Sequence, residues 1–254
     1  MDEQVSKRNK LALDVLRLSR NTLLVNLRFL DAALNQLEPL IVEGLTIATD
    51  GEALAYDPAH VLRMYKEERE AVTRAYLHMV LHGVFRHMFV HTLVDHHVWD
   101  LACDIAVEYV IAGLGLKAVT TARELLQKSV YAELQKEIKQ LTAEKIYRYY
   151  LDKQLSQQKL AELRGAFHND DHRLWYMNEA EKALALGRPV SVSVSVEDSE
   201  GDGDGEGTGL PVGVSAAEAR WSEISRRMQM DMETFSKLQG DRAGASSICS
   251  SVTW

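Results

Sequence analysis

Apolar residues recur at three- and four-residue spacing along most of this chain, which is the period of an amphipathic helix. The first run covers residues 8–37 and fits one long or two short helices. It ends at Pro39, because proline cannot donate the backbone hydrogen bond that a helix needs. The same period predicts further helices over residues 59–67, 69–92, 97–113, 119–136, 142–163 and 215–239, the last ending at Gly240.

One stretch departs from the helical period. Between residues 45 and 56, two β-prone runs flank Asp50 and Gly51, a pair typical of tight turns, so the sequence predicts a β-hairpin. Asp57 and Pro58 follow as the expected N-cap and first residue of the next helix. The sequence has no internal repeat. The predicted fold class is therefore α+β and mostly helical, with a small β-hairpin near residues 45–56.

Composition narrows the class of protein. The chain has 254 residues, 46% of them hydrophobic, which is enough for a large core in one large or two modest domains. Its formal net charge of −8 argues against a nucleic-acid partner or an anionic membrane surface. No run approaches the roughly 20 apolar residues of a membrane span, and no apolar signal segment is visible at the N-terminus. Because Cys103 and Cys249 cannot form a disulfide framework, we expect a cytoplasmic protein.

The acidic charge is concentrated in one place. Residues 197–206 hold six acidic side chains and no Lys or Arg, and the whole tract 197–213 is rich in glycine. This composition cannot bury apolar surface, which predicts a linker or a long surface loop. The alternating Val and Ser residues at 190–196 fit either a strand or part of that linker. The predicted organisation is a domain over 1–188, an acidic Gly-rich linker or loop over 189–214, and a C-terminal helix and tail over 215–254 that packs back on the first domain.

Histidine is concentrated as strongly, with six of the nine His residues between positions 78 and 97. His78 and His82 lie about 40° apart on one helical face, one turn from each other, so both imidazoles can bind one metal ion. A pair with this spacing is also a common polar surface feature, so the metal interpretation needs further ligands. His87 lies on the opposite face and is a poor third ligand unless the helix breaks near Gly83.

An acidic face on the following helix supplies a better ligand. Asp100, Asp104 and Glu108 are spaced four residues apart within an otherwise apolar run. A carboxylate in such a run is costly to bury unless it is paired or bound to a metal. Two further histidine pairs, His87/His91 and His96/His97, are expected at the polar surface or in support of the ligands. The methionines are expected in the core or as gap-filling residues, namely Met64, Met79 and Met88.

Five segments carry a more specific signal. They read TIATDGEALAYDP (46–58), LHMVLHGVFRH (77–87), VWDLACDIAVEYVI (98–111), DDHRLW (170–175) and KLQGDRAG (237–244). In this order they resemble the metallopeptidase domain that precedes a von Willebrand factor A-like domain in bacterial proteins and is commonly encoded beside MoxR-type AAA+ ATPases. The resemblance implies a zincin-like helical fold, zinc as the cofactor, and an AAA+ ATPase as a protein partner.

The resemblance also implies a set of site residues. His78 and His82 match the two metal-binding histidines of the family, and His87 matches its third helix histidine. Asp104 matches the Asp that the helical spacing already favours as third ligand. His172, with Asp171 and Trp175, matches a DDHxxW element and is expected at the site as a ligand or in support of one. The implied metal set is therefore His78, His82, Asp104 and His172.

The important departure from the family is Met79, which stands where the HExxH motif has glutamate. That glutamate takes a proton from the attacking water, and a thioether cannot accept one at neutral pH. Glu108, where the family tends to have asparagine, is a weak candidate for a substitute base. The sequence ends at Trp254, about where the family continues into its von Willebrand-like half, which fits a truncated chain or a variant without that half.

Two functions compete on this evidence. The leading one is a degenerate, non-catalytic metallopeptidase-like protein that binds zinc and a protein partner, for which a MoxR-type AAA+ ATPase is the expected candidate. The alternative is a zinc-dependent metallopeptidase that uses a non-standard general base. Nucleic-acid binding is a weaker third, because the sequence has no basic stripe.

Overall fold

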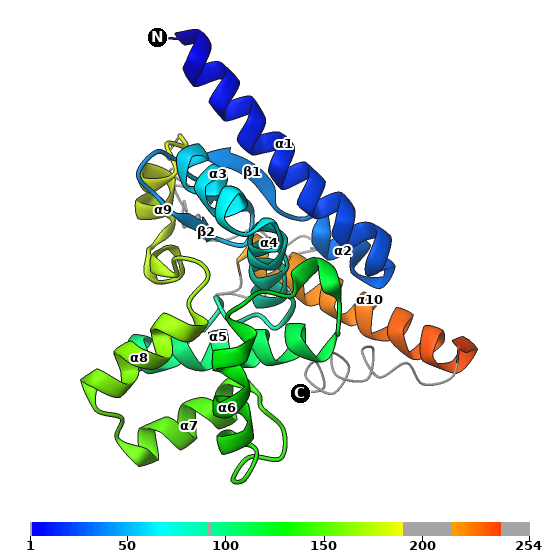
Figure 1. Ribbon diagram of the computed structural model, residues 1–254, viewed down its shortest axis with the longest axis vertical. Coiled ribbons are helices and arrows are strands. Elements are labelled where there is room, and N and C mark those ends of the chain that lie inside the picture. The colour runs from blue at the N-terminus through cyan, green and yellow to red at the C-terminus, as the bar shows by residue number, and fades with distance from the viewer. Residues whose placement is uncertain (1, 91–92, 190–214, 240–254) are drawn as a thin grey trace, which may run out of the picture.

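Helices dominate the computed structural model, which describes residues 2–90, 93–189 and 215–239 (Figure 1). In chain order its α-helices and strands are α1 (Asp2–Asn26), α2 (Asp31–Leu34), β1 (Glu38–Ile41), β2 (Ile47–Thr49), β3 (Ala53–Tyr56), α3 (Pro58–Glu67), α4 (Arg69–Val84), α5 (His96–Gly113), α6 (Glu124–Leu134), α7 (Ala143–Lys153), α8 (Gln157–Phe167), α9 (Glu179–Ala185) and α10 (Ala216–Gln239). Its 3₁₀ helices are η1 (Arg28–Leu30), η2 (Lys117–Val119) and η3 (Arg173–Tyr176). The predicted mostly helical α+β class is confirmed.

The sheet has three strands in the order β1, β3, β2. β2 and β3 pair antiparallel, which confirms the hairpin predicted near residues 45–56. Asp50 closes its turn, because the Oδ1 atom accepts hydrogen bonds from the backbone N–H groups of Glu52 (2.9 Å) and Ala53 (2.7 Å). Gly51 has a left-handed φ of +91°, a conformation that glycine adopts without steric cost.

β1 is a strand that the sequence analysis did not predict. It pairs parallel with β3 at the edge of the sheet, with Pro39 opposite Leu54. An edge position tolerates a proline, which lacks the backbone N–H of a central strand. The side chains of β1 are mostly exposed, so the segment shows no alternating pattern that would reveal a strand. Its conformation depends on pairing with β3.

Several helices agree with their predicted ranges at the start or throughout. The run over 8–37 differs from both of its alternatives, because it forms the long helix α1, which begins earlier at Asp2, followed by η1 and the short α2. Asp57 and Pro58 are confirmed as N-cap and first residue of α3, because Asp57 Oδ1 accepts a hydrogen bond from the Ala59 backbone N–H at 2.7 Å. α5 and α10 each begin within one residue of the predicted start.

Other predicted helix limits were wrong, because a helical period continues through positions where the backbone turns. α4 ends at Val84 rather than at 92, and Arg86 beyond it has a left-handed φ of +59°. The run over 142–163 forms two helices, α7 and α8, separated by Gln154 at φ +50°. α6 begins at Glu124 rather than at 119.

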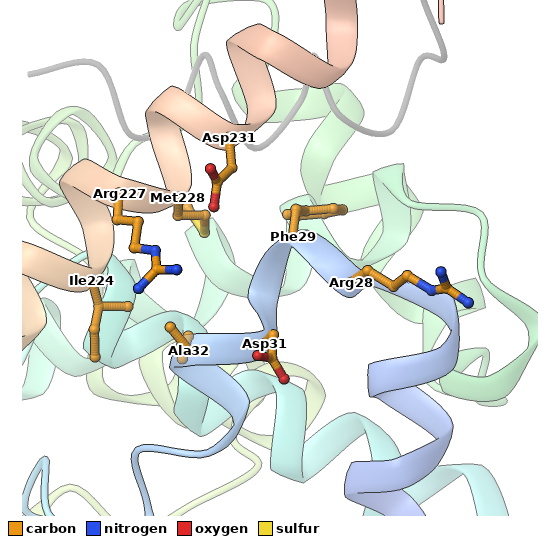
Figure 2. Close-up of a pocket in the computed structure, with 9 residues that line it drawn as sticks. Arg28, Phe29, Asp31, Ala32, Ile224, Arg227, Met228 and Asp231 are labelled. Atoms are coloured by element: carbon orange, nitrogen blue, oxygen red, sulfur yellow. The ribbon is translucent and has the colours of Figure 1, made fainter. Parts of the chain in front are cut away.

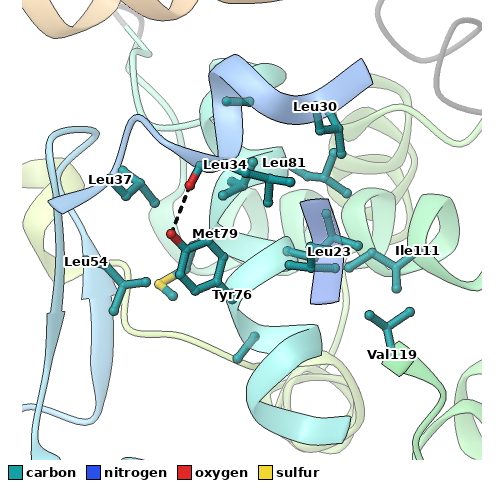
Figure 3. Close-up of a cluster of buried hydrophobic side chains, with 14 of the residues drawn as sticks. Leu23, Leu30, Leu34, Leu37, Leu54, Tyr76, Met79, Leu81, Ile111 and Val119 are labelled. Carbon is teal, nitrogen blue, oxygen red and sulfur yellow. Dashed lines mark hydrogen bonds between the residues drawn. The ribbon is translucent and has the colours of Figure 1, made fainter. Parts of the chain in front are cut away.

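α4 is the central helix of the fold, with α1, α3 and α5 packed against it (Figure 1). All of its residues from 72 to 84 are buried. Met79 lies in an apolar cluster with Tyr76 and Leu54, and the Tyr76 hydroxyl donates a hydrogen bond to the Leu34 carbonyl at 3.0 Å (Figure 3). The three methionines expected in the core are buried or partly buried there, as predicted for Met64, Met79 and Met88.

α10 packs against α4 and α2, and Trp221 is its fully buried anchor. The indole N–H of Trp221 donates a hydrogen bond to the Gly51 carbonyl at 2.7 Å. Its ring lies so close to Gly83 that a Cβ atom at that position would stand 2.5 Å from it. Farther along α10, Met228 faces Phe29 across a pocket of about 260 Å³ (Figure 2). The hairpin, α4 and α10 therefore meet at one tryptophan.

Within the described residues, no helix combines the length and apolar character needed to cross a membrane. Several expectations from the sequence lie outside the described residues. They concern the alternating run 190–196, the acidic tract 197–213, His91, Cys249 and the end of the last helix at Gly240.

Candidate metal centre

Five buried side chains converge beside α4. His78 and His82 come from α4, Asp104 comes from α5, and Asp170 and His172 come from the segment between α8 and η3. Each offers one ligand atom, and these atoms all lie within 4.8 Å of one another. The structure thus brings together all four residues that the sequence singled out as metal ligands, and it adds Asp170.

The spacing of the ligand atoms matches that of a coordination shell. His78 Nε2 lies 2.8 Å from His82 Nε2 and 3.3 Å from both Asp104 Oδ1 and Asp170 Oδ1. His172 Nε2 lies 3.2 Å from the same two carboxylate oxygens. Ligands held tetrahedrally at 2.0–2.1 Å from zinc are separated by about 3.3 Å. The separations of His78 and His172 from the two carboxylates lie near this value, and all five atoms lie within 4.8 Å of one another, close enough to share one small cation.

Helix geometry and the β-hairpin together position these donors. A separation of four residues places His78 and His82 on one face of α4, which packs against α5 and so faces Asp104. The remaining donors are held by the hairpin, because the Asp171 backbone N–H donates to the Ile47 carbonyl at 2.8 Å. This contact forms an isolated β-bridge between the donor segment and β2. The small sheet thus anchors one side of the site.

Each of the three histidines turns its Nε2 atom inward and has a partner near its Nδ1 atom. The Glu108 carboxylate lies 2.7 Å from His78 Nδ1. The Nδ1 atom of His87 lies 2.9 Å from that of His82, and Asp100 Oδ1 lies 3.4 Å from His172 Nδ1. Such outer partners fix the orientation and tautomer of metal-binding histidines. The arrangement therefore directs all three Nε2 atoms toward one point.

The sequence predicted His87 either at the polar surface or in support of the ligands. It is not at the surface, because only 3% of the residue is exposed. The helix ends just before it, and its backbone N–H donates to the His82 carbonyl at 3.0 Å through the left-handed turn at Arg86. This turn carries the ring back onto His82, in the supporting position that was the other expectation. His96 and His97 are exposed.

Glu108 faces away from the donor atoms, on the Nδ1 side of His78. Its Oε2 accepts hydrogen bonds from Arg74 Nε (2.7 Å) and Gln127 Nε2 (3.0 Å), and its Oε1 accepts one from Asn169 Nδ2 (2.7 Å). Both carboxylate oxygens are thus engaged. Arg74, which the sequence analysis did not single out, is itself 1% exposed and compensates this buried charge.

Trp175 covers the site from one side. Its ring stacks on His172 with centroids 3.7 Å apart and an interplanar angle of 13°, and it meets the edge of His82 at 4.8 Å. The side chain of Asp171 lies outside the cluster, where it binds Arg173. Met79 also lies outside, in the apolar cluster on another face of α4. The chain neighbours of two donors therefore take no part in the donor set.

The charges within the cluster balance one another. Burial would lower the pKa of His172, but the carboxylates of Asp104 and Asp170 overcome this effect and raise it to about 10. Burial also opposes protonation of His78, whose pKa the same carboxylates nevertheless raise well above its ordinary value. Burial and the neighbouring His78 lower the pKa of His82 to about 4, so His82 is neutral at pH 7. The carboxylates of Asp104 and Asp170 thus favour positive charge at the point where the side chains of the cluster meet.

Two further observations show that these residues fit a metal ion. Asp170 Oδ2 is buried and has no hydrogen-bond partner among the described residues, a costly state for a carboxylate oxygen. Burial also lowers the pKa of His87 far below its ordinary value, so its neutral ring can accept the Nδ1 proton of His82. His82 then presents an unprotonated Nε2, the form that binds metals. The donor set of imidazoles and carboxylates is one that zinc accepts.

Sequence reasoning missed two important participants. Asp170 stands directly before Asp171 in the DDHRLW segment, and the sequence analysis expected Asp171 at the site, whereas the structure places Asp170 there. Arg74 lies four residues before His78, on the same face of α4, and that spacing was the signal available for it. Both become recognisable only through contacts made across the fold.

Comparison with known proteins agrees with this geometry. Residues 6–244 match the model of a family described as "putative metallopeptidase domain". No curated protein and no solved structure matches the chain. The family match covers nearly the whole sequence and includes all five donor residues. This chain therefore belongs to the putative metallopeptidase domain family.

Proposed function

We propose that this chain is a non-catalytic member of its family, in which one zinc ion stabilises the fold for binding to a protein partner. The ion would be held by His78, His82, Asp104, Asp170 and His172. The observation that carries the proposal is the convergence of five buried donors on one point. Bound zinc would connect α4, α5 and the segment before η3, and its binding free energy would add to the stability of the fold.

The number of donors supports a structural role. Catalytic zinc sites use three protein ligands and keep a further position open for water or substrate. Five protein donors converge here, two more than a catalytic site uses, and all of them are buried. A site of this kind holds its ion without offering it to a substrate.

The surroundings of the donors also argue against hydrolysis. A general base must lie within hydrogen-bond reach of the proton that it abstracts. Met79 has no basic atom and packs in the apolar cluster. Glu108, the candidate substitute base, faces the Nδ1 side of His78, and both of its oxygens are bound by other side chains. Its geometry supports a positioning role for His78.

Metal analysis tests the metal-binding part of the proposal. Protein purified without a His-tag and dialysed is expected to retain about one zinc per chain. His82→Ala should lose this zinc, whereas His97→Ala should keep it, because His97 is exposed on α5 outside the cluster. Wild-type protein without stoichiometric metal, or equal metal content in both variants, would contradict the proposal.

An assay of proteolysis tests the non-catalytic part. Zinc-loaded protein is expected to leave an unfolded substrate such as casein intact during prolonged incubation. Zinc-dependent cleavage that disappears in His82→Ala would favour the alternative, a metallopeptidase with a non-standard base. Glu108→Gln would then show whether that base is Glu108, because unchanged turnover in this variant excludes it.

The proposal of a partner rests only on the resemblance of the sequence motifs to the family. The candidate is a MoxR-type AAA+ ATPase. When the two purified proteins are mixed, we expect the zinc-loaded chain to co-purify with the ATPase. His82→Ala should bind more weakly if the metal shapes the docking surface. Absence of any complex at micromolar concentrations would exclude this partner and leave the metal-binding proposal unaffected.

A further inference from the structure

A cavity other than the one at Phe29 and Met228 lies beside the candidate metal centre. None of the five donor residues lines it. It is a cleft of about 420 Å³ between α3, the first turn of α4, and the segments around residues 121–123 and 168–169. This volume is within the range of small-molecule binding sites. Arg63, Arg123 and Thr121 are among the residues that line it.

Thr121 provides the first sign of a ligand. Its side chain is only 6% exposed, and its Oγ1 atom has no hydrogen-bond partner among the described residues. Buried hydroxyl groups almost always have a partner, because leaving one unpaired costs about 1–3 kcal/mol. Thr121 is one of the residues that line the cleft, and its buried hydroxyl has its hydrogen-bonding capacity left over for a group bound beside it.

Arg123 provides the second sign. It is half-buried, and its Nη1 atom donates hydrogen bonds to the His168 carbonyl (2.8 Å) and to Asn169 Oδ1 (2.7 Å). Both acceptors are neutral, and within the described residues no carboxylate pairs with this guanidinium. The same contacts fix its plane and leave the Nε and Nη2 donors without an acceptor in the described structure. Arg123 is therefore a positioned cation at the edge of the cleft.

Both signs of charge line the cleft, because the carboxylates of Glu67 and Glu68 lie there together with three arginines. Arg74 also lines it, but Glu108 and Glu124 compensate its charge. Glu68 Oε1 accepts a hydrogen bond from the Ala122 backbone N–H at 2.9 Å, which directs this carboxylate to the start of α6. Arg63 and Arg123 are therefore the lining cations for which the described residues provide no carboxylate partner.

We propose that this cleft binds a small molecule through an oxyanion group, either a carboxylate or a phosphate, that accepts hydrogen bonds from Arg123 and Thr121. An oxyanion is the acceptor-only partner that a guanidinium and a hydroxyl together require. The site is independent of zinc, so it survives if the proposed metal function fails. Asn169 connects the two sites, because it contacts Arg123 and also donates to Glu108.

NMR titration of the full-length protein tests this site, with inorganic phosphate in one series and succinate in the other. Ionic strength is held constant with chloride. We expect saturable shifts in the amides of residues 121–123 and 169, both with and without zinc. Tighter binding of phosphate would indicate a phosphorylated ligand, and tighter binding of succinate a carboxylate ligand.

Three variants separate a built site from general charge attraction. Thr121→Val keeps the side-chain shape, and because the hydroxyl has no partner, folding stability should stay the same or rise. It should nevertheless weaken binding about 10-fold or more, as should Arg123→Gln. Arg148→Gln, which removes an exposed charge from α7, should leave binding unchanged. Non-saturable shifts, or undiminished binding in Thr121→Val and Arg123→Gln, would overturn the proposal.

Discussion

Two adjacent aspartates, Asp170 and Asp171, have opposite environments in this protein. The Asp170 side chain is fully buried among the imidazoles of the cluster, whereas that of Asp171 is partly exposed and pairs with Arg173. The bridge to β2 explains the difference, because extended backbone sends successive side chains to opposite sides. One backbone contact thus determines which carboxylate becomes a donor.

Replacing either aspartate with asparagine gives a matched test at this scale. Asp170→Asn keeps the shape of the side chain but removes a charged donor, so zinc affinity is expected to fall at least about 10-fold. Asp171→Asn should leave zinc affinity unchanged. Competition with a fluorescent zinc chelator measures both, and equal affinities would exclude Asp170 from the donor set.

Asp57 shows how a single residue starts an element. Its carboxylate accepts hydrogen bonds from the backbone N–H groups of Ala59 (2.7 Å) and Gly44 (3.1 Å), so it caps α3 and ties the loop before β2 to it. Burial would raise the pKa of Asp57, but these backbone donors hold it below its ordinary value of 3.8. The cap is therefore strongest when the carboxylate is ionised.

Loss of this cap should destabilise the protein at α3 to an extent that depends on pH. Asp57→Ala should lower the free energy of unfolding by about 1 kcal/mol at pH 7. Because the folded pKa is depressed, the charge-dependent part of this contribution is present above pH 3.8 and is lost as pH falls through the lower, folded value. Asp57→Asn keeps a capping oxygen and should lack that pH dependence. Urea unfolding at pH 7 and pH 3 measures the difference.

At the scale of elements, α4 and α10 approach each other closely because position 83 has no side chain. The Trp221 ring fills the space in which a Cβ atom would lie. A glycine within a helix is intrinsically unfavourable by about 1 kcal/mol relative to alanine. Gly83 therefore lowers the intrinsic stability of α4, but it allows the contact with α10. The same tryptophan reaches the hairpin through Gly51.

Gly83→Ala should therefore destabilise the fold despite its better helix propensity. The added methyl group collides with the Trp221 ring, and such overpacking costs about 1–3 kcal/mol. Gly165→Ala in α8 is the matched control, because no atom lies within 4 Å of its added Cβ, and it should stabilise slightly. If both variants unfold at the same urea concentration, α10 does not pack on Gly83 as described.

At the scale of the whole molecule, α4 belongs to the core and to the candidate metal centre at once. Met79 and Tyr76 pack in the apolar cluster, while His78 and His82 reach the donors from α5 and the segment before η3. The donor cluster therefore joins segments that are far apart in the chain. A bound ion would restrain all of them together.

Removal of metal should accordingly lower the stability of the entire protein. At free zinc concentrations near 100 times the dissociation constant, the ion contributes about 2.7 kcal/mol to the free energy of unfolding. A chelator is expected to lower the Tm of the zinc-loaded wild type and to leave that of His82→Ala unchanged. A wild-type Tm that does not respond to chelator would show that the cluster does not bind metal in solution.

The sequence by itself determined the helical class, the hairpin and four of the five donors. These features are encoded locally: the helical period, the turn at Asp50 and Gly51, and the four-residue spacing of His78 and His82 all act within a few residues. The four-residue spacing of Asp100, Asp104 and Glu108 also favoured Asp104 as third ligand, and the resemblance to a known family then added His172.

Only the tertiary structure decided the rest, because those features depend on contacts between distant segments. β1 is a strand through its pairing with β3, and Asp170 is a donor through the bridge to β2. The role of Glu108 also depends on such contacts, since Arg74 and Asn169 turn it into a partner of His78 with no free oxygen. Spacing along a helix indicates which side chains share a face, but burial and partners depend on what packs against that face.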